Sequence, residues 1–345
     1  MQTISFDEGF LRDRYLRLGR LDIMPPWHAA FYRRLPRKRF LWRWRRIVSQ
    51  FRPQLLYVNS VVMIQGARSL GVVDVPVLVH IHELDSFMKP FLESNRDRDL
   101  LLTWPTRFIA VSEAVRELLV KSMGIPEEKV GLVYEFIRDE VLSFGHPQPP
   151  SATDRRGRPF VIGGAGTPGW RKGVTLWLQT AAAVKRLLPG MALEFRWVGM
   201  MDNPYADTTR LEAKKLGVED IVRFMPRMER PLDQFEEFDV FAMTSWEDPC
   251  PLVVLENMAL GKPVVCFQRG GGAAEEVGNG GIVVPEFRPE MMAQAIAELA
   301  KDDSRREALG KIARSRVKEK FMVSVQAPKL LAEMRRTAAK DGVYV

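Results

Sequence analysis

Short apolar runs alternate with longer segments of helical periodicity from residue 53 onward, and this alternation constrains the fold more than any other feature of the chain. It is typical of βα units, in which helices join parallel strands. The first series predicts strands at 54–59, 76–82, 107–112 and 130–134, with helices at 61–70, 90–102 and 113–123. The second series predicts strands at 159–163, 192–198, 221–224, 239–243, 263–267 and 281–284. We therefore expect an α/β protein that ends in helices at 289–300, 304–321 and 325–339.

A polar, proline-rich stretch at 146–158 separates the two series and has the composition of an interdomain linker. The chain, at 345 residues, is also longer than one hydrophobic core usually covers. We predict an N-terminal Rossmann-like domain over 1–150, a C-terminal one over 151–325 and a helical tail over 326–345. Doubly wound sheets bind ligands beyond the carboxyl ends of their strands, so the expected site is a cleft between the two domains.

The excess of positive charge lies entirely in the first 50 residues, which hold 12 Lys or Arg and 4 Asp or Glu, against 39 of each in the remainder. Its densest part runs from Arg33 to Arg46 and includes Trp42 and Trp44. A basic segment with tryptophan suits an anionic membrane surface. The alternative is a solvated basic helix whose aromatic rings pack on the domain beneath. Because the rest of the chain is balanced in charge, no nucleic-acid partner is predicted.

The sequence features that report on location predict a cytoplasmic protein. No signal peptide is visible, and no apolar run approaches the ~18 residues that a membrane span requires. Cys250 and Cys266 lie in or beside apolar runs without metal-ligand spacing, so we interpret them as core residues in a reducing compartment. Peripheral association with the inner membrane face is expected only if the basic segment binds lipid.

The segment after the predicted strand at 239–243 carries the strongest chemical signal. Pro251 is predicted to open a helix, since its missing N–H would have no partner there. The amides of Leu252 and Val253 then stay free at the positive end of the helix dipole, which suits a phosphate. Glu256 is four residues beyond Leu252 and therefore lies on the same face of the helix, where it would hold ribose hydroxyls. Asp248 would hold sugar hydroxyls on the other side of the phosphates.

This segment resembles glycosyltransferase family 4, whose members are retaining enzymes of the GT-B fold. The family's motif is Glu, seven residues, Glu, then a tail of a small residue, Met-Ala, any residue, Gly, any residue and Pro-Val. Here Asp248 takes the first acidic position and Glu256 the second, while Glu247 is one residue out of register. The departure from Glu to Asp shortens the reach of the first acid. A capped helix with incidental acids is the alternative interpretation.

A second segment, from Phe160 to Leu178, reads as a strand, a glycine-rich turn and a helix. In the family a lysine before this helix, here Lys172, grips the donor diphosphate together with an arginine. Gly166 falls near the place of that arginine, so Arg171 is the substitute. The same turn contains the GxGxxG dinucleotide pattern, but its proline and the inserted Trp-Arg-Lys fit that use badly.

Two further segments extend the resemblance. Gly271, Gly272 and Glu275 match the family's Gly-Gly-x-x-Glu loop, where glycines let the backbone approach the donor. His82, rather than His80, lies at the strand end where the family has a histidine that hydrogen-bonds the donor sugar. A histidine in a purely structural role is the alternative. The segment around Ser112 resembles a strand-to-helix connection of the family.

The resemblance covers about residues 53–325 and implies a transferase that moves a sugar from a nucleoside diphosphate donor to a saccharide or lipid-linked acceptor. It implies catalysis by His82, Asp248 and Lys172, no cofactor and no metal. The Asp97-Arg-Asp99 sequence is interpreted as exposed helix surface. Family members usually open with a strand, a glycine-rich loop and a helix, which the first 50 residues do not show, so the N-terminal domain is expected to be abbreviated. The alternatives are a catalytically silent nucleotide-sugar-binding subunit and a nucleotide-dependent oxidoreductase.

Overall fold

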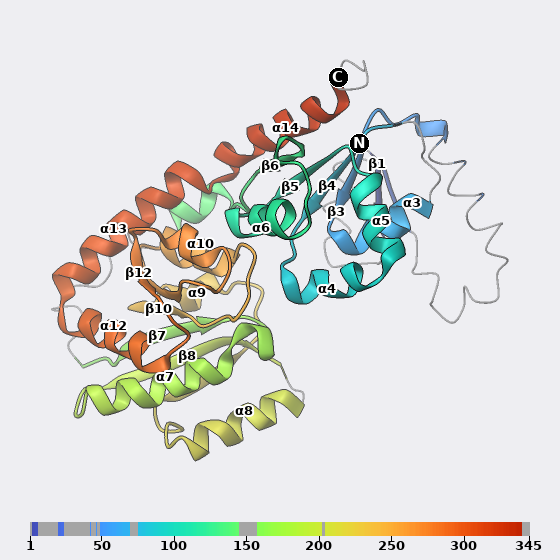
Figure 1. Cartoon of the computed structure of the whole chain (residues 1–345). Coiled ribbons are helices and arrows are strands. Elements are labelled where there is room, and N and C mark those ends of the chain that lie inside the picture. Colours follow the sequence, from blue (N-terminus) through green and yellow to red (C-terminus); the bar gives the residue numbers. More distant parts are fainter. Residues whose placement is uncertain are drawn as a thin grey trace.

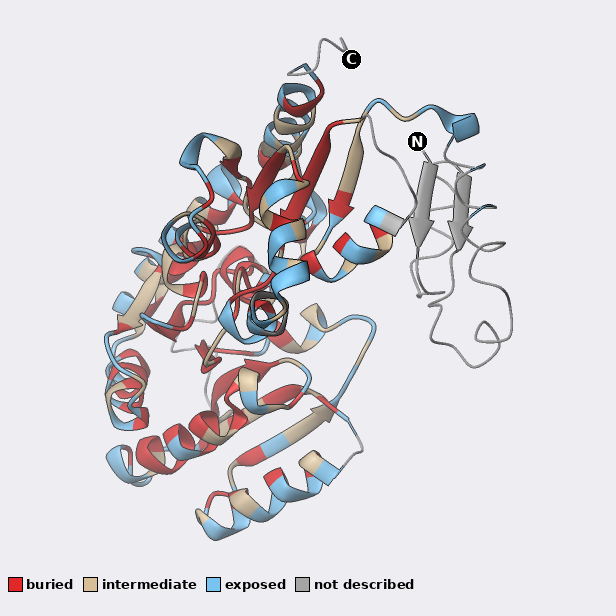
Figure 2. Ribbon diagram, turned by 45° about the vertical axis from the view of Figure 1, so that its right-hand side comes forward, coloured by how far each residue is buried: buried red, intermediate tan, exposed pale blue. Residues whose placement is uncertain are grey.

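The computed structural model of the chain contains two parallel β-sheets covered by helices, with helices α13 and α14 running along one side (Figure 1). It describes residues 2–5, 20–23, 42, 46, 49–69, 75–144, 157–201 and 204–339. Buried residues concentrate on the strands and on the inner faces of the helices, whereas exposed residues lie on the outer faces (Figure 2). The predicted GT-B architecture of two doubly wound domains is confirmed.

The N-terminal sheet has the strand order β3-β4-β5-β6, all parallel. Its strands are Leu56–Asn59, Val77–Ile81, Arg107–Ala110 and Val130–Leu132. Its helical segments are η2 (Val61–Met63), α3 (Ile64–Ser69), α4 (Asp85–Glu93), α5 (Asn95–Thr103), α6 (Glu113–Glu117), the π-helical η3 (Leu118–Ser122) and η4 (Glu127–Lys129). A further 3-10 helix, η5 (Asp139–Ser143), follows the sheet. All five residues of β4 are buried, as expected for a central strand with both faces covered.

The C-terminal sheet has the order β12-β11-β10-β7-β8-β9, again parallel. In chain order its strands are Phe160–Ala165, Leu193–Met200, Val222–Pro226, Val240–Met243, Val264–Phe267 and Gly281–Val284. The helices between and after them are η6 (Trp170–Lys172), α7 (Val174–Leu187), α8 (Pro204–Lys215), α9 (Leu232–Phe235), α10 (Leu252–Ala259), α11 (Ala273–Val277), α12 (Pro289–Lys301) and α13 (Asp303–Lys320). Strand order reverses between β7 and β10, which is where doubly wound sheets bind ligands.

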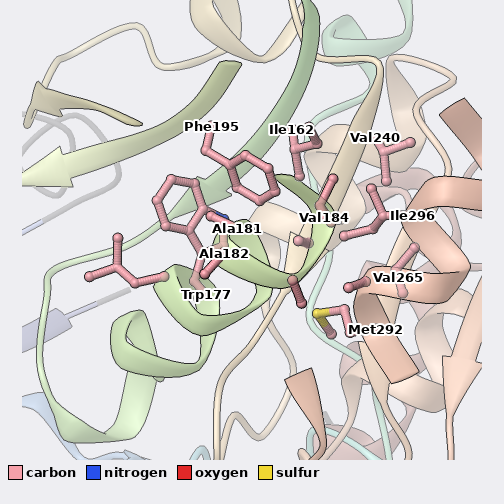
Figure 3. Packing of buried hydrophobic residues seen from close by; sticks show 14 of the residues in the cluster. Ile162, Trp177, Ala181, Ala182, Val184, Phe195, Val240, Val265, Met292 and Ile296 are labelled. Carbon is pink, nitrogen blue, oxygen red and sulfur yellow. The ribbon is translucent and has the colours of Figure 1, made fainter. Parts of the chain in front are cut away.

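The largest core cluster lies between this sheet and helices α7 and α12 (Figure 3). Trp177 of α7 is fully buried, and its ring meets that of Phe195 edge to face at a centroid distance of 5.3 Å. The small side chains of Ala181 and Ala182 let α7 pack closely on the strands. Replacing a buried aromatic residue of this kind by alanine typically costs about 3–5 kcal/mol, so the cluster fixes the helix that follows the glycine-rich turn.

The last helix, α14 (Val323–Ala339), returns to the N-terminal sheet. Its Leu330 and Met334 pack with Leu78 and Ile109, on the face of the sheet opposite the main core of that domain. Glu333 forms an ion pair of 2.8 Å with Arg107, whose side chain is buried. The C-terminal helices of the chain therefore contact both domains.

Two observations refine the secondary structure that the sequence predicts, and one predicted segment lies outside the described residues. Strands β1 (Gln2–Ser5) and β2 (Arg20–Ile23) form a parallel pair, whereas no strand was predicted before residue 53. The single helix predicted at 90–102 is two helices, because Ser94 has extended backbone angles and its hydroxyl caps α5 by accepting from the Asp97 amide. The linker predicted at 146–158, with the domain boundary at 150, lies almost entirely outside the described residues.

Within the described ranges, no helix is both long and apolar enough to cross a membrane. The basic segment from Arg33 to Arg46 falls outside them except for Trp42 and Arg46, which are both exposed. The Arg46 guanidinium lies 5.6 Å from the centroid of the Trp42 ring, within the range of a cation–π contact.

Candidate functional site

A cavity of about 310 Å³ lies between the two domains. The N-terminal domain contributes Val62, His82, Glu83, Phe87, Val111 and Glu135, and the C-terminal domain contributes Arg171, Glu247, Asp248, Pro249 and Cys250. His82 directly follows β4, and the Glu247–Cys250 stretch follows β10. The cavity therefore lies beyond the carboxyl ends of strands from both sheets, where the alternation of strands and helices predicted a site.

The two cations of the glycine-rich segment meet the first acid of the acidic motif. Lys172 Nζ donates to Asp248 Oδ2 at 2.6 Å, and Arg171 Nη1 lies 3.5 Å from the same oxygen. Arg171 also donates to the Glu247 carbonyl at 2.9 Å. Only 17% of the Lys172 side chain and 8% of the Asp248 side chain are exposed, so water screens this pair less than it would a surface pair.

Glycines allow the lysine segment to approach the loop that follows β10. Gly166 has a φ of 131°, and a Cβ there would lie 3.1 Å from the Lys172 side chain. Gly173, with a φ of 64°, would place a Cβ 2.0 Å from the Thr244 carbonyl oxygen. The 3-10 helix η6 intervenes between β7 and α7, whereas a dinucleotide-binding turn leads straight from strand to helix. The Trp246 amide then donates to the Arg171 carbonyl at 2.9 Å and joins the two segments.

The predicted glycine loop pairs with the acidic loop through its backbone. The Asp248 amide donates to the Gly270 carbonyl, and the Gly272 amide donates to the Asp248 carbonyl, both at 2.9 Å. Gly271 has a φ of 96°, and a Cβ there would lie 2.2 Å from the Asp248 carbonyl oxygen. A Cβ on Gly272 would lie 2.1 Å from the Pro249 carbonyl oxygen. Glycine at these two positions is therefore what lets the loop hold Asp248 in place.

Helix α10 begins one residue later than the sequence predicted. Pro251 is not its first residue but the N-cap that precedes it, with extended backbone angles, and its carbonyl accepts from the Val254 amide at 2.9 Å. The amides of Leu252 and Val253 remain outside the helix's own hydrogen-bond ladder, as predicted. Burial raises the pKa of Glu256 to about 7. These three residues do not line the interdomain cavity, which therefore joins His82, Arg171 and Asp248 but not α10.

His82 has two polar partners that the sequence did not indicate. Its Nδ1 lies 2.5 Å from Glu135 Oε1, and its Nε2 lies 2.8 Å from Asn59 Oδ1. Glu135 follows β6 and Asn59 ends β3, so the three side chains come from the carboxyl ends of three strands of one sheet. His80, in contrast, is buried, and its ring lies 4.2 Å from that of His82. The strand-end argument that preferred His82 over His80 therefore selected the histidine that lines the cavity.

Two glutamates of the C-terminal domain hydrogen-bond to the N-terminal domain. Glu247 accepts from the Ser86 amide at 3.2 Å and from the Ser86 hydroxyl at 3.0 Å, at the start of α4. Glu275 accepts from the Glu113 amide at 2.9 Å, at the start of α6, next to Ser112, which caps that helix. Burial is the largest cause that raises the pKa of Glu275 to about 7. Sequence patterns gave no signal for either contact, because both depend on how the domains face each other.

A buried carboxyl group contacts Cys250, one of the residues that line the cavity. Glu276 is fully buried and accepts a hydrogen bond from Cys250 Sγ at 2.9 Å. Burial raises the pKa of Glu276 well above its ordinary value and does the same for the Cys250 thiol. Both cysteines are buried and free, as the sequence predicted.

The described residues hold no group of three or more His, Cys, Asp or Glu side chains arranged to bind a metal ion. Asp97 and Asp99 lie on α5, the helical placement that the sequence predicted for them.

Comparison with known families finds two successive matches. The family described as Glycosyltransferase Family 4 matches residues 5–141, and the family described as Glycosyl transferases group 1 matches residues 159–302. Among curated proteins, a D-inositol 3-phosphate glycosyltransferase from Kribbella flavida is 38% identical over 104 residues, which are 29% of this chain and 24% of that protein. The protein of the same description from Corynebacterium kroppenstedtii is 30% identical over 217 residues, 59% of this chain and 48% of the relative. The matched segments thus span less than half the length of these relatives.

Solved structures share the fold over nearly the whole chain. Anabaena Alr3699/HepE in complex with UDP superposes with a TM-score of 0.79 at 18% identity, covering 96% of this chain and 90% of that one. A glycosyltransferase from Rickettsia africae gives a TM-score of 0.75 at 15% identity, covering 98% and 90%. At these identities the likeness concerns the architecture.

Proposed function

Because the chain belongs to glycosyltransferase family 4, we propose that it transfers a sugar from a nucleoside diphosphate donor to an acceptor hydroxyl and retains the anomeric configuration. The observation that carries this proposal is that Lys172 and Arg171 meet Asp248, and that Arg171, Asp248 and His82 line one interdomain cavity. Two cations beside a carboxylate suit a site that neutralises a diphosphate and orients the attached sugar.

Each residue of the site has a chemical role in this proposal. Lys172, Arg171 and the amides of Leu252 and Val253 neutralise the leaving diphosphate, and Gly166, Gly271 and Gly272 let the backbone come close to it. Glu256 accepts from ribose hydroxyls, while Asp248 and His82 hold hydroxyls of the transferred sugar. The α10 amides lie outside the cavity in this form, so donor binding would extend the site from the cavity toward the start of α10.

The chemical step exchanges two bonds at the anomeric carbon of the sugar. The bond to the diphosphate oxygen breaks, and a bond to the acceptor oxygen forms on the same face of the sugar. The acceptor's proton passes to the leaving diphosphate, so no protein base is needed. Stabilisation of the charge on the leaving group supplies most of the rate enhancement in such a step. The proposal includes no divalent metal ion, because Lys172, Arg171 and the first amides of α10 neutralise the negative charge of the diphosphate.

The acceptor is proposed to be a saccharide or a lipid-linked saccharide in cell-surface polysaccharide or glycolipid synthesis. The support is of two kinds. The basic segment with Trp42 and Trp44 would bring the cleft to an anionic membrane. The structural neighbours include a protein described as a lipopolysaccharide outer core galactosyltransferase, WaaB, with a TM-score of 0.70 at 13% identity.

A donor screen followed by a turnover assay tests this function. UDP-, GDP-, ADP- and dTDP-sugars are compared by thermal shift, since a ligand at 100 times its Kd stabilises the folded state by about 2.7 kcal/mol. The selected donor is then incubated with candidate acceptors, with D-inositol 3-phosphate among them, and product is followed by mass spectrometry. We expect one nucleotide to raise the melting temperature and its sugar to be transferred or slowly hydrolysed. Binding without any turnover would indicate a silent nucleotide-sugar-binding subunit, and stabilisation by NAD(P) alone would indicate an oxidoreductase.

A further inference from the structure

The part of the cavity that the N-terminal domain lines contains a histidine, His82, with an oxygen atom beside each ring nitrogen. Glu135 Oε1 lies 2.5 Å from His82 Nδ1, and Asn59 Oδ1 lies 2.8 Å from His82 Nε2. The His82 and Glu135 side chains are each 26% exposed and both line the cavity. A ligand that enters the cavity therefore meets this pair directly.

The contact with Glu135 determines which ring nitrogen of His82 carries a proton. A carboxylate oxygen only accepts hydrogen bonds, so the nitrogen that faces it, Nδ1, is the donor. The Tyr57 hydroxyl donates to Asn59 Oδ1 at 3.4 Å and lies 2.5 Å from His80 Nδ1, so the side chain of Asn59 is itself held in a hydrogen-bond network.

The other charged groups around His82 are accounted for by their own contacts. His80 is neutral, because burial, and next the nearby His82, lower its pKa to about 3. The Glu83 carboxylate accepts from the Ser60 hydroxyl and from the Val61 and His82 amides.

Across the cavity, the charged groups are likewise engaged with one another or with the other domain. Arg171 lies beside Asp248, and Glu247 accepts from Ser86. Among the described lining residues, Glu135 is thus the carboxylate that contacts the His82 ring.

We propose that Glu135 is a positioning residue for His82, whose imidazole it holds in a fixed orientation with a proton on Nδ1, so that Nε2 is the ring nitrogen that meets a hydroxyl of the donor sugar. This inference rests on the proposed function. On donor binding, His82 Nε2 would exchange its Asn59 partner for the sugar hydroxyl, while the Nδ1–H group stays hydrogen-bonded to Glu135.

The first test needs no substrate. The ¹⁵N shifts of the His82 ring at neutral pH are compared between the wild type, Glu135→Gln and the matched control Glu140→Gln, which removes the same charge at an exposed position of η5. The four histidines of the chain are assigned with a His82→Gln variant. We expect Nδ1 to carry a proton in the wild type and the control, and the proton to shift towards Nε2 in Glu135→Gln. An unprotonated Nδ1 in the wild type, or no change in Glu135→Gln, would overturn the proposal.

The second test is a double-mutant cycle on turnover. We expect Glu135→Gln to lower kcat by about 10- to 100-fold, the range found for carboxylates that orient metal-bound histidines, and Glu135→Asp to recover part of that loss. The Kd of the nucleoside diphosphate should stay unchanged. The variant that combines Glu135→Gln with His82→Ala should be no slower than His82→Ala alone.

A fully additive double variant with a native melting temperature would show that Glu135 does not act through His82. The two tests also separate the two proposals. If no donor is turned over by the wild type, the proposed function fails, while the ¹⁵N measurement still decides whether Glu135 sets the proton on His82.

Discussion

Lys172 and Asp248, 76 positions apart in the sequence, form an ion pair of 2.6 Å, and Asp248 lines the interdomain cavity. The pair joins the glycine-rich segment after β7 to the acidic loop after β10. Ordering a lysine side chain costs up to about 2 kcal/mol of conformational entropy. Asp248 already orders the ammonium group of Lys172. Binding of a diphosphate beside it therefore does not incur the entropic cost of ordering this side chain a second time.

The position of Asp248 depends on Gly271, so Gly271→Ala should impair the donor site. The matched control is Gly124→Ala, since Gly124 also has a positive φ, 71°, but a Cβ there meets nothing within 4 Å. We expect each variant to lose about 1 kcal/mol of unfolding free energy from backbone strain. Only Gly271→Ala should also lose nucleoside diphosphate affinity, because its Cβ would push the Asp248 carbonyl away. Equal affinities of the two variants in calorimetry would contradict this role.

The raised pKa of Glu256 predicts how stability depends on pH. Unfolded Glu256 ionises near 4.5, whereas the folded residue stays protonated up to about 7. Between these values the unfolded state binds fewer protons than the folded state, so the free energy of unfolding should fall as pH rises through this window and level off above it. Glu275, with a pKa raised to about 7, contributes in the same direction.

Glu256→Gln removes one of these contributions and should flatten the pH profile. Urea denaturation at pH 5 and pH 8 measures it, with the exposed Glu219→Gln as control. Relative to the wild type, we expect Glu256→Gln to gain about 1–2 kcal/mol between the two pH values, less than a full 2.5-unit shift would give because the side chain keeps some contact with water. Parallel profiles for the wild type and Glu256→Gln would mean that this carboxyl ionises in the folded protein as it does in water.

His82→Ala should separate chemistry from nucleotide binding. The proposed contact of His82 is to the transferred sugar, so turnover should fall by about 10²-fold, as when a donor to the transition state is removed. The affinity for the nucleoside diphosphate should change by less than about threefold. Both quantities are measured on the same preparation, by steady-state kinetics and calorimetry. An equally steep loss of nucleotide affinity would make His82 a structural residue.

Periodicity predicted the strands from residue 53 onward, and motif spacing predicted that the segments of Lys172 and Asp248 belong to one site. The reason is that β7, β10 and β11 are short, continuous apolar runs flanked by turn residues, so their carboxyl ends are visible in the sequence. The predicted ends of the helices were less accurate than the predicted strands. Ser94 caps a second helix inside a continuous helical pattern, and a capping serine is hard to distinguish there from an ordinary exposed residue.

Contacts that depend on tertiary geometry could not be predicted. Glu135 and Asn59 reach His82 only because β3, β4 and β6 lie in one sheet, and their local sequence patterns carry no chemical signal. Glu247 was set aside as out of register, yet it bonds Ser86 of the other domain. The strands β1 and β2 were also missed, since their sequences, QTIS and RLDI, mix polar and apolar residues and do not form the continuous apolar runs of the later strands.

The segment from Arg33 to Arg46 is predicted to dock the protein on anionic membranes. Liposome cosedimentation is compared for neutral and anionic vesicles, for low and raised salt, and for a variant with Arg43, Arg45 and Arg46 changed to Ser. Binding should require anionic lipid and weaken as salt shortens the Debye length, which is about 8 Å at physiological ionic strength. Each arginine near the surface is worth about 1 kcal/mol, so the triple variant should lose most of the binding. Binding that does not depend on lipid charge, salt concentration or these substitutions would favour a solvated helix that packs on the domain beneath.

Calorimetric titration of the nucleoside diphosphate selected by the donor screen, with and without EDTA, tests the central claim of a donor site built on Lys172 and Glu256. The wild type should bind equally in both conditions. Lys172→Ala should lose about 10- to 100-fold in affinity, as expected for charge-assisted hydrogen bonds of about 1.5–3 kcal/mol, and Glu256→Gln should also bind more weakly. Lys185→Ala, at an exposed lysine of α7 that pairs with Asp220, should bind like the wild type. Loss of wild-type binding on chelation, or undiminished binding by Lys172→Ala, would contradict a metal-free donor site at this position.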